Sequence, residues 1–238
     1  MHILRLPWLW NLHCLFAKTL ESGGTHVRLI VSFSKTGPAR FISHLDLQRL
    51  WQRVLKIAGV QMQMSKGFNP HPKMRFALPL ATGYESRGEL LEISVLTPVT
   101  PGDLQVRLNA ILPEGLLVVA CQEAPENMPK LTAMVAGLGY ELYFAKEPDM
   151  EKAERILAGN SIVEQKDKKF NIKDFLIYWH QDKKILQLRL HVQNQVTVRP
   201  ELAAAHLFPE SPLLRVIRTE FFTCFDGDLP VGLKSLDC

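Results

Sequence analysis

The chain has 238 residues, of which 47% are hydrophobic and 22% are charged, and its formal net charge is +4. These values are ordinary for a soluble globular protein with one large or two small domains. The charge is uneven, because eight basic residues stand against one acid, Asp46, between Lys35 and Leu80; this segment carries +7 and the remainder −3. The imbalance excludes a uniformly basic protein and predicts an anionic partner at this segment.

Cysteine usage excludes the common metal centres. The cysteines are far apart, with no C-x-x-C pair and no Cys/His spacing typical of a zinc or iron–sulfur site; they are Cys14, Cys121, Cys224 and Cys238. We therefore predict that the chain binds no metal and no cofactor, and that its thiols are reduced in the cytoplasm.

The first 25 residues are predicted to be a non-core extension. Apolar residues crowd Ile3 to Ala17, but this run is shorter than the ~20 residues of a membrane-spanning helix, and Pro7, Asn11 and His13 interrupt it. No membrane span is expected. A signal peptide is the alternative, although the start carries little charge and no small-x-small cleavage site follows.

The residue pattern at 26–123 predicts an N-terminal half of the protein with the element order β-α-β-β-α-β. Strands are expected at 26–35, 74–80, 89–96 and 116–122, and the second helix at 101–112. Ser43 and Asp46 have the spacing of a capping box that begins the first helix, and Gly59 is placed to end it. The stretch 81–88 is rich in turn residues. This order is the ferredoxin-like arrangement.

A second half of the same order is predicted at 132–223, after a linker at 124–131 that Pro125 and Pro129 mark. Its strands are expected at 140–145, 161–165, 184–193 and 214–223, and its helices at 149–158 and 202–207. Residues 175–179 stay unassigned, and 224–238 form a tail. The predicted fold class is α+β, with two tandem ferredoxin-like halves.

Three strings of residues resemble a known family. FISHLDLQRL at 41–50, SKGFNPHPKMRFALPL at 65–80 and GYESRGELLEI at 83–93 are similar to those of the radical-SAM-linked proteins, a bacterial group of unknown function. Members of that group occur beside, or fused to, a B12-binding-type radical SAM protein. The resemblance covers roughly residues 27–222 and implies a radical SAM protein as partner. The three-cysteine motif that binds the radical SAM cluster is absent, so this chain is not itself the radical enzyme.

The first helix is predicted to carry a basic ridge, formed by Arg49, Arg53 and Lys56 at spacings of four and three. Few acids compensate this ridge, which therefore suits a phosphate backbone or an acidic protein surface, with a plain solvated face as the alternative. The lysines of two later turns alternate with Asp167 and Asp182 and are predicted to be solvated; they are Lys166, Lys168, Lys169, Lys183 and Lys184.

The loop SKGFNPHPK is predicted to expose an aromatic ring and an imidazole among cations. Pro70 and Pro72 hold His71 in extended geometry, which suits phosphate contact. Phe68 either stacks on an unpaired base or folds back onto the core. We interpret one set of residues as binding RNA or a protein partner: Arg40, His44, Arg49, Arg53, Lys56, Lys66, Phe68, Asn69, His71, Lys73 and Arg75.

No catalytic motif is present, since the chain lacks a phosphate-binding loop, a dinucleotide fingerprint, H-E-x-x-H and G-x-S-x-G. His44 near Asp46 is the candidate general base, and the alternative is that Asp46 serves the helix cap alone. Three functions follow. The favoured one is a non-catalytic accessory protein that binds transfer or ribosomal RNA for a radical SAM enzyme. The alternatives are a module that docks only on that enzyme, and a metal-independent RNA endonuclease with His44 as base and Lys73 or Arg75 as charge stabiliser. The oligomeric state is not indicated.

Overall fold

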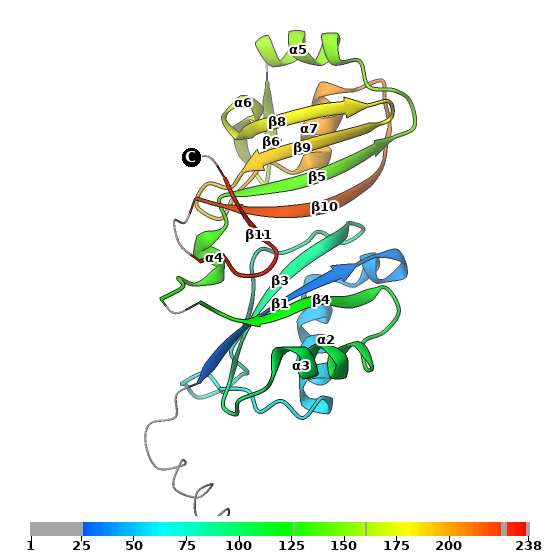
Figure 1. Ribbon diagram of the computed structural model, residues 1–238. Helices are drawn as coiled ribbons and strands as arrows, with labels where there is room; N and C mark the ends of the chain where they lie inside the picture. The colour runs from blue at the N-terminus through cyan, green and yellow to red at the C-terminus, as the bar shows by residue number, and fades with distance from the viewer. Residues whose placement is uncertain (1–25, 126, 160, 225–227, 237–238) are drawn as a thin grey trace, which may run out of the picture.

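The computed structural model describes residues 26–236 apart from 126, 160 and 225–227. The predicted extension at 1–25 lies outside these residues. The described chain has a mixed α+β fold in which short helices lie against one large sheet (Figure 1). Within the described ranges, every helix is too short or too polar to cross a membrane.

The N-terminal part of the sheet is built around β1 (Val27–Lys35). This strand pairs antiparallel with β3 (Glu85–Val95) and β4 (Leu116–Glu123), and β2 (Met74–Phe76) pairs antiparallel with the far side of β3. The strand order is therefore β4-β1-β3-β2. Helices α2 (His44–Ile57) and α3 (Pro101–Asn109) cover one face of these strands (Figure 1).

Helix α2 begins and ends as its sequence predicts. The Ser43 hydroxyl accepts a hydrogen bond from the Asp46 amide over 3.2 Å, which confirms the predicted cap. Gly59 lies just beyond the helix with a φ of +71°, a conformation that glycine adopts without strain. The apolar face is buried, and Trp51 packs on Phe33 of β1 with ring centroids 4.8 Å apart. A short 3-10 turn, η2 (Gly37–Phe41), precedes the helix.

Two predicted boundaries near β3 are wrong. The strand expected at 74–80 ends at Phe76, and β3 begins at Glu85 inside the stretch predicted to be a turn. Ser86 pairs with Lys35 on one side and Arg218 on the other, so neighbouring strands hold this polar stretch extended. Glu85 and Glu89 of β3 look like surface residues in sequence, but two arginines of a later strand, Arg215 and Arg218, pair with them.

The C-terminal part of the sheet has the order β10-β5-β9-β8. Its strands are β5 (Gly137–Phe144), β8 (Leu176–Asp182), β9 (Ile185–His191) and β10 (Leu213–Thr223), and all their pairings with one another are antiparallel. A parallel pairing of β10 with β3 joins both parts into one nine-stranded sheet of the described residues. Within the predicted tail, β11 (Leu233–Ser235) pairs parallel with β10.

The predicted tandem ferredoxin-like topology is not confirmed. The segment expected as the second strand of the C-terminal half, β6 (Ile162–Gln165), pairs instead with β7 (Lys168–Asn171) in a separate two-stranded sheet. The φ values of Lys166 and Asp167 are +51° and +60°, which suits a two-residue hairpin turn. Strand β8, which includes most of the unassigned stretch 175–179, takes the sheet edge beside β9.

Four further helices belong to the described chain. They are α4 (Leu131–Met134), α5 (Met150–Ala158), α6 (Ile172–Phe175) and α7 (Pro200–Leu207). Helix α5 begins at a cap where the Asp149 carboxylate accepts from the Lys152 amide over 2.9 Å.

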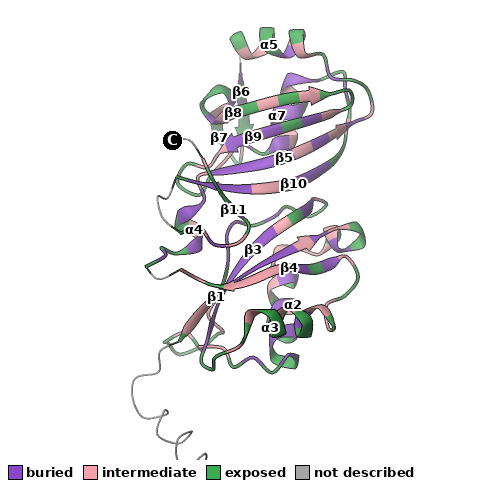
Figure 2. Cartoon of the chain, viewed as in Figure 1, coloured by how far each residue is buried: buried purple, intermediate pink, exposed green. Residues whose placement is uncertain are grey.

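Buried residues follow the length of β1, β3, β5 and β10 (Figure 2). One core lies between the N-terminal strands and helices α2 and α3. The other contains most of the C-terminal part, together with Ile30 and Leu90 from the opposite face of β1 and β3. These two strands are thus buried on both faces, and the two predicted halves share a core. The division at residues 124–131 stays a prediction. The prediction that the thiols are reduced is wrong at Cys224, which forms a disulfide, whereas Cys121 is a free thiol.

Candidate nucleic-acid interface

The predicted binding residues at the start of α2 lie in a cluster of buried charges. Lys35, counted in the basic segment, is 1% exposed and donates from Nζ to the Ile42 carbonyl over 2.8 Å. Arg40 donates to the Glu85 carboxylate over 3.1 Å, and Arg215 of β10 contacts the same carboxylate. Burial alone raises the pKa of Glu85, but hydrogen bonds from Arg215 and Arg40 lower it below its ordinary value. Lys35 is therefore not available to a partner.

His44 is the first residue of α2 and is half-buried. Its ring meets Phe76 edge-on at a centroid distance of 5.2 Å, and its Nε2 lies 3.1 Å from Gln48 Nε2. Asp46 is engaged elsewhere, with the Ser43 hydroxyl at 2.7 Å and Arg49 at 3.2 Å. Burial lowers the pKa of His44, although the Glu89 carboxylate opposes this. The structure thus places Asp46 in the helix cap and gives His44 no carboxylate within hydrogen-bond distance among the described residues.

Along α2, the ridge residues Arg49, Arg53 and Lys56 are all exposed. Arg49 is partly neutralised by Asp46, and both side chains are mostly exposed, so this ion pair contributes little to stability. The ridge lies on the solvent side of the helix, opposite the residues that pack on the sheet.

The loop at 65–73 has a closed base and an exposed tip. Ser65 donates its amide to the His71 carbonyl over 2.8 Å, and its hydroxyl accepts from the His71 amide over 3.0 Å. The same hydroxyl lies 2.9 Å from His71 Nδ1, which fixes the imidazole. Gly67 has a φ of +144°, which an L side chain rarely adopts. The exposed side chains of the tip include Lys66, Phe68 and Asn69, and the ring of Phe68 is fully exposed rather than packed on the core.

Beside this loop lies a hollow of about 390 Å³ with a strong excess of positive charge. Its cations are Arg28, Lys73, Arg75 and Lys130; its other lining residues are His26, Gln63, Ser65, His71, Pro72, Met74, Glu92 and Ser94. One carboxylate therefore stands against four cationic side chains and two histidines.

Glu92 at the wall of the hollow is already saturated with donors. Its Oε1 accepts from Arg28 over 3.3 Å and from Arg75 over 3.5 Å, and its Oε2 accepts from the Leu131 amide over 3.0 Å. In the part of the chain that the structure describes, neither Lys73 nor Lys130 forms an ion pair. The charges of Lys73 and Lys130 are consequently free for an anion.

Gln63 adds a second sign of a binding site. Its side-chain oxygen Oε1 is buried and has no hydrogen-bond partner among the described residues, and Gln63 lines the hollow. A buried polar atom without a partner costs about 1–3 kcal/mol, which a bound donor would recover.

The sheet separates the hollow from the ridge. Leu91 and Ile93 of β3 face the core under α2, so Glu92 between them points to the opposite face. Arg75 pairs with Glu92 across β2 and β3 and shares its face, whereas Phe76 packs under α2. The predicted basic surface is therefore two surfaces on opposite faces of the sheet.

Three basic or imidazole side chains of the lining escaped the sequence interpretation, because they lie outside the basic segment. Arg28 is the second residue of β1, Lys130 lies near the end of the predicted linker, and His26 precedes β1. Arg28 also donates to the carbonyls of Met128 and Pro129 over 2.6 and 2.9 Å, which ties the linker to the hollow. Only a contact map could have found them. Among the described residues, no group of three or more His, Cys, Asp or Glu side chains is arranged to hold a metal ion.

Comparisons with known proteins give one family. A family model described as an uncharacterized protein conserved in bacteria (DUF2344) matches residues 28–200. No curated protein matches the chain. Among solved structures, the crystal structure of an unknown protein from Galdieria sulphuraria is similar at 15% identity and a TM-score of 0.27, and the similarity covers 70% of this chain and 80% of that one.

Proposed function

Since the chain belongs to the bacterial DUF2344 family, whose description names no activity, we propose a function from the site itself. The protein is a non-catalytic accessory protein that binds RNA at the hollow and its loop. It presents this RNA to a radical SAM protein, which is the partner that the three resembling strings imply, in the cytoplasm.

The charge of the hollow is the observation that supports RNA. Phosphate oxygens are recognised by Lys and Arg side chains, and two lysines here have no ion pair within the described chain. The hollow is open and most of its cations are partly or fully exposed, as a polymer that passes across the surface requires.

The exposed ring of Phe68 supports an unpaired base rather than a duplex. It projects from a loop whose base is closed by Ser65 and His71, so little ordering remains to be done on binding. Stacking of a base on such a ring contributes about 1–3 kcal/mol. Cations beside an aromatic ring are the combination found in single-strand binding surfaces.

The geometry does not favour the endonuclease alternative. His44 contacts Phe76 in the core under α2, whereas Arg75 points into the hollow on the opposite face of the sheet. Lys73 lines the hollow as well, so the suggested base and both suggested charge stabilisers belong to different surfaces, which favours binding over cleavage.

Retardation of labelled cellular RNA in a native gel, repeated at several salt concentrations, tests the RNA part. If four cations contact phosphates of a single strand, the logarithm of the affinity falls against the logarithm of salt with a slope of about −3. Replacing Lys73 and Lys130 together by Ala should weaken binding and reduce that slope by about 1.4.

The matched control lies on the other face of the sheet. Replacing Arg53 and Lys56 by Ala removes the same charge from the ridge and should leave affinity and slope unchanged. Absence of retardation at low salt, or equal loss from both pairs of substitutions, would contradict the assignment of RNA to the hollow.

Co-purification of the C-terminally tagged protein from its native organism tests the partner. A radical SAM protein and one RNA class in the same eluate would support the whole proposal. Recovery of the radical SAM protein after nuclease treatment, with no RNA in untreated samples, would instead make the hollow a protein-docking surface.

A further inference from the structure

A second cavity, of about 430 Å³, lies where the two predicted halves meet. Its walls come from the segment after β2 (78–81), from β5, from the β6–β7 hairpin, from the loop at 195–199 and from Arg218 of β10. Its volume is within the range of about 300–1,000 Å³ typical of small-molecule sites. The cavity is remote in sequence from the basic segment except at 78–81 and Tyr84, and it plays no part in the RNA proposal.

One part of the cavity is apolar and aromatic. Leu138 and Tyr140 of β5 contribute buried side chains, and Phe170 of β7 contributes a half-buried ring. Tyr84 donates its hydroxyl to Glu201 on α7 and so closes one end of the cavity. Flat rings fit walls of this kind, because aromatic side chains pack offset or edge-on against them.

The other part carries free positive charge. Lys166 and Lys168 line the cavity and form no ion pair with any residue that the structure describes. The two arginines of the lining are already paired, Arg199 with Glu201 at 3.8 Å and Arg218 with Glu89. The two lysines are therefore the groups left for an anionic ligand.

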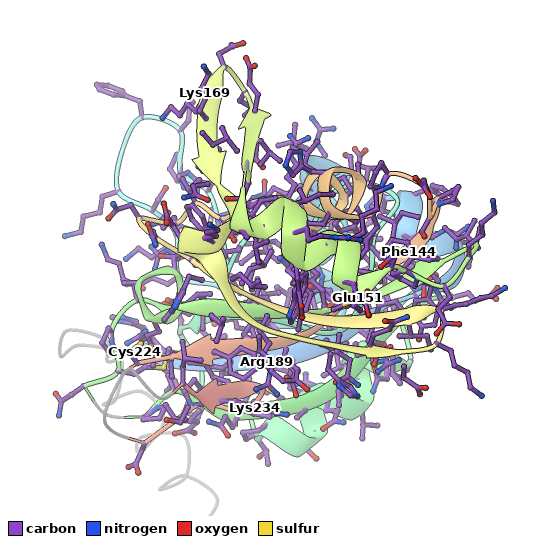
Figure 3. All side chains as sticks on the ribbon, turned by 90° about the horizontal axis from the view of Figure 1, so that it is seen from above. Phe144, Glu151, Lys169, Arg189, Cys224 and Lys234 are labelled. Atoms are coloured by element: carbon purple, nitrogen blue, oxygen red, sulfur yellow. The ribbon has the colours of Figure 1, made fainter. Side chains whose placement is uncertain are left out.

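The register of the hairpin explains why Lys168 reaches the cavity. Gln165 pairs with Lys168, and Val163 pairs with Phe170, so these four side chains share one face of β6 and β7. Lys169 pairs with Glu164 on the other face, and Figure 3 shows Lys169 on the hairpin that stands out from the body of the protein. The positive turn φ values hold the two strands in this register.

A buried hydroxyl without a hydrogen-bond partner completes the site. Thr197 lines the cavity, and its hydroxyl Oγ1 is buried without a hydrogen-bond partner among the described residues. The backbone around it is held by Gln165, which donates to the Thr197 carbonyl over 3.1 Å and accepts from the Arg199 amide over 2.8 Å. A rigid wall with one unused hydroxyl is suited to a ligand that can hydrogen-bond.

We infer that this cavity binds a mononucleotide. The base lies against the apolar and aromatic part, the phosphate lies at Lys166 and Lys168, and Thr197 supplies a hydrogen bond to the sugar or base. The inference is independent of the RNA proposal, because the hollow contributes no residue to this cavity.

Calorimetric titration of the full-length protein with each of the four ribonucleoside monophosphates tests the inference. At least one should bind with one-to-one stoichiometry, and Lys168→Ala should weaken it by about tenfold, the usual effect of losing one charged phosphate contact. Lys169→Ala is the matched control and should bind as the wild type does. Binding by none of the four, or equal weakening by both substitutions, would overturn the inference.

Two further variants test whether the nucleotide binds in this cavity or elsewhere on the protein. Val196 lines the cavity from an exposed position, so Val196→Trp should block binding while the thermal midpoint stays unchanged. The Lys73→Ala substitution in the hollow should leave mononucleotide binding intact. Retained binding in Val196→Trp, or its loss in Lys73→Ala, would place the nucleotide elsewhere. Competition by a 5′-phosphorylated oligoadenylate distinguishes a site for RNA ends, which the oligomer fills, from a site for free nucleotides, which it does not.

Discussion

Glu89 and Glu92 lie three residues apart on β3, and their exposed fractions are 2% and 6%. Glu89 faces the core under α2 and is bound by Arg218, itself 2% exposed, whose Nε donates to Glu89 Oε1 over 2.8 Å. Glu92 faces the opposite side and is bound by Arg28 and Arg75, which border the open hollow. The two carboxylates are similarly buried, but Arg218 is buried with Glu89, whereas the side chains of Arg28 and Arg75 are 27% and 44% exposed.

The comparison teaches that burial of a carboxylate does not decide its role. Around Glu89, Arg218 is further held by the carbonyls of Leu78 and Pro79, so every charge is satisfied within the fold. Around Glu92, the lysines of the hollow remain unpaired in the described chain. The first cluster is expected to stabilise the fold, and the second to bind a ligand.

The largest expected effect comes from breaking the buried ion pair between Arg218 and Glu89. Arg218→Met leaves Glu89 as an unpaired buried charge and should lower the free energy of unfolding by about 3–5 kcal/mol. Denaturant unfolding measures this loss. The double variant Arg218→Met with Glu89→Leu removes both charges and should recover most of the stability. A small effect of Arg218→Met alone would show that the pair contributes little.

Substitutions in the loop beside the hollow should weaken RNA binding without lowering the stability of the fold. Phe68→Ala removes the exposed ring and should weaken RNA binding by about 1–3 kcal/mol, measured by fluorescence anisotropy, with unfolding changed by less than about 0.5 kcal/mol. Phe41→Ala is the control, because Phe41 is another exposed ring on the α2 side of the sheet. Equal losses in both variants would argue against stacking at the loop.

Changing Glu92 should lower the stability of the fold and raise its affinity for RNA. Glu92→Gln keeps an acceptor for the Leu131 amide but removes the charge shared by Arg28 and Arg75. Stability should fall by about 1 kcal/mol, and RNA affinity should rise because the hollow loses its carboxylate. Weaker RNA binding in this variant would mean that Glu92 holds the arginines in the binding geometry.

The smallest effect is a pH dependence of the free energy of unfolding, which arises from His44. Burial lowers the pKa of His44 from its ordinary value of 6.5, so below that pH the unfolded chain binds a proton that the folded protein does not. Stability should therefore fall as the pH drops below 6.5, until the folded-state pKa is reached. In His44→Gln this contribution should disappear, as denaturant midpoints at pH 7.5 and 5.5 would show.

The wild type measured at the same two pH values is the control. A dependence that persists in His44→Gln would assign it to other groups.

Much of the local structure could be predicted from the sequence, because short-range patterns decide it. The spacing of Ser43 and Asp46 set the start of α2, and the apolar period through Leu47 and Trp51 set its buried face. That period also placed Arg53 and Lys56 in solvent. The proline and glycine content of the loop indicated an irregular, exposed segment around Phe68.

Only the tertiary structure decided which charges meet. Strand pairing brings Arg28, from the first strand, and Arg75, from the second, to the same carboxylate of β3, and Lys130 arrives through the linker. It also buries Lys35 and turns the ridge away from the hollow. In the C-terminal part, the β6–β7 hairpin satisfies itself locally and leaves the sheet edge to β8. Helix caps and apolar periods act over a few residues and are visible in sequence, whereas strand partners are chosen by competition among distant segments.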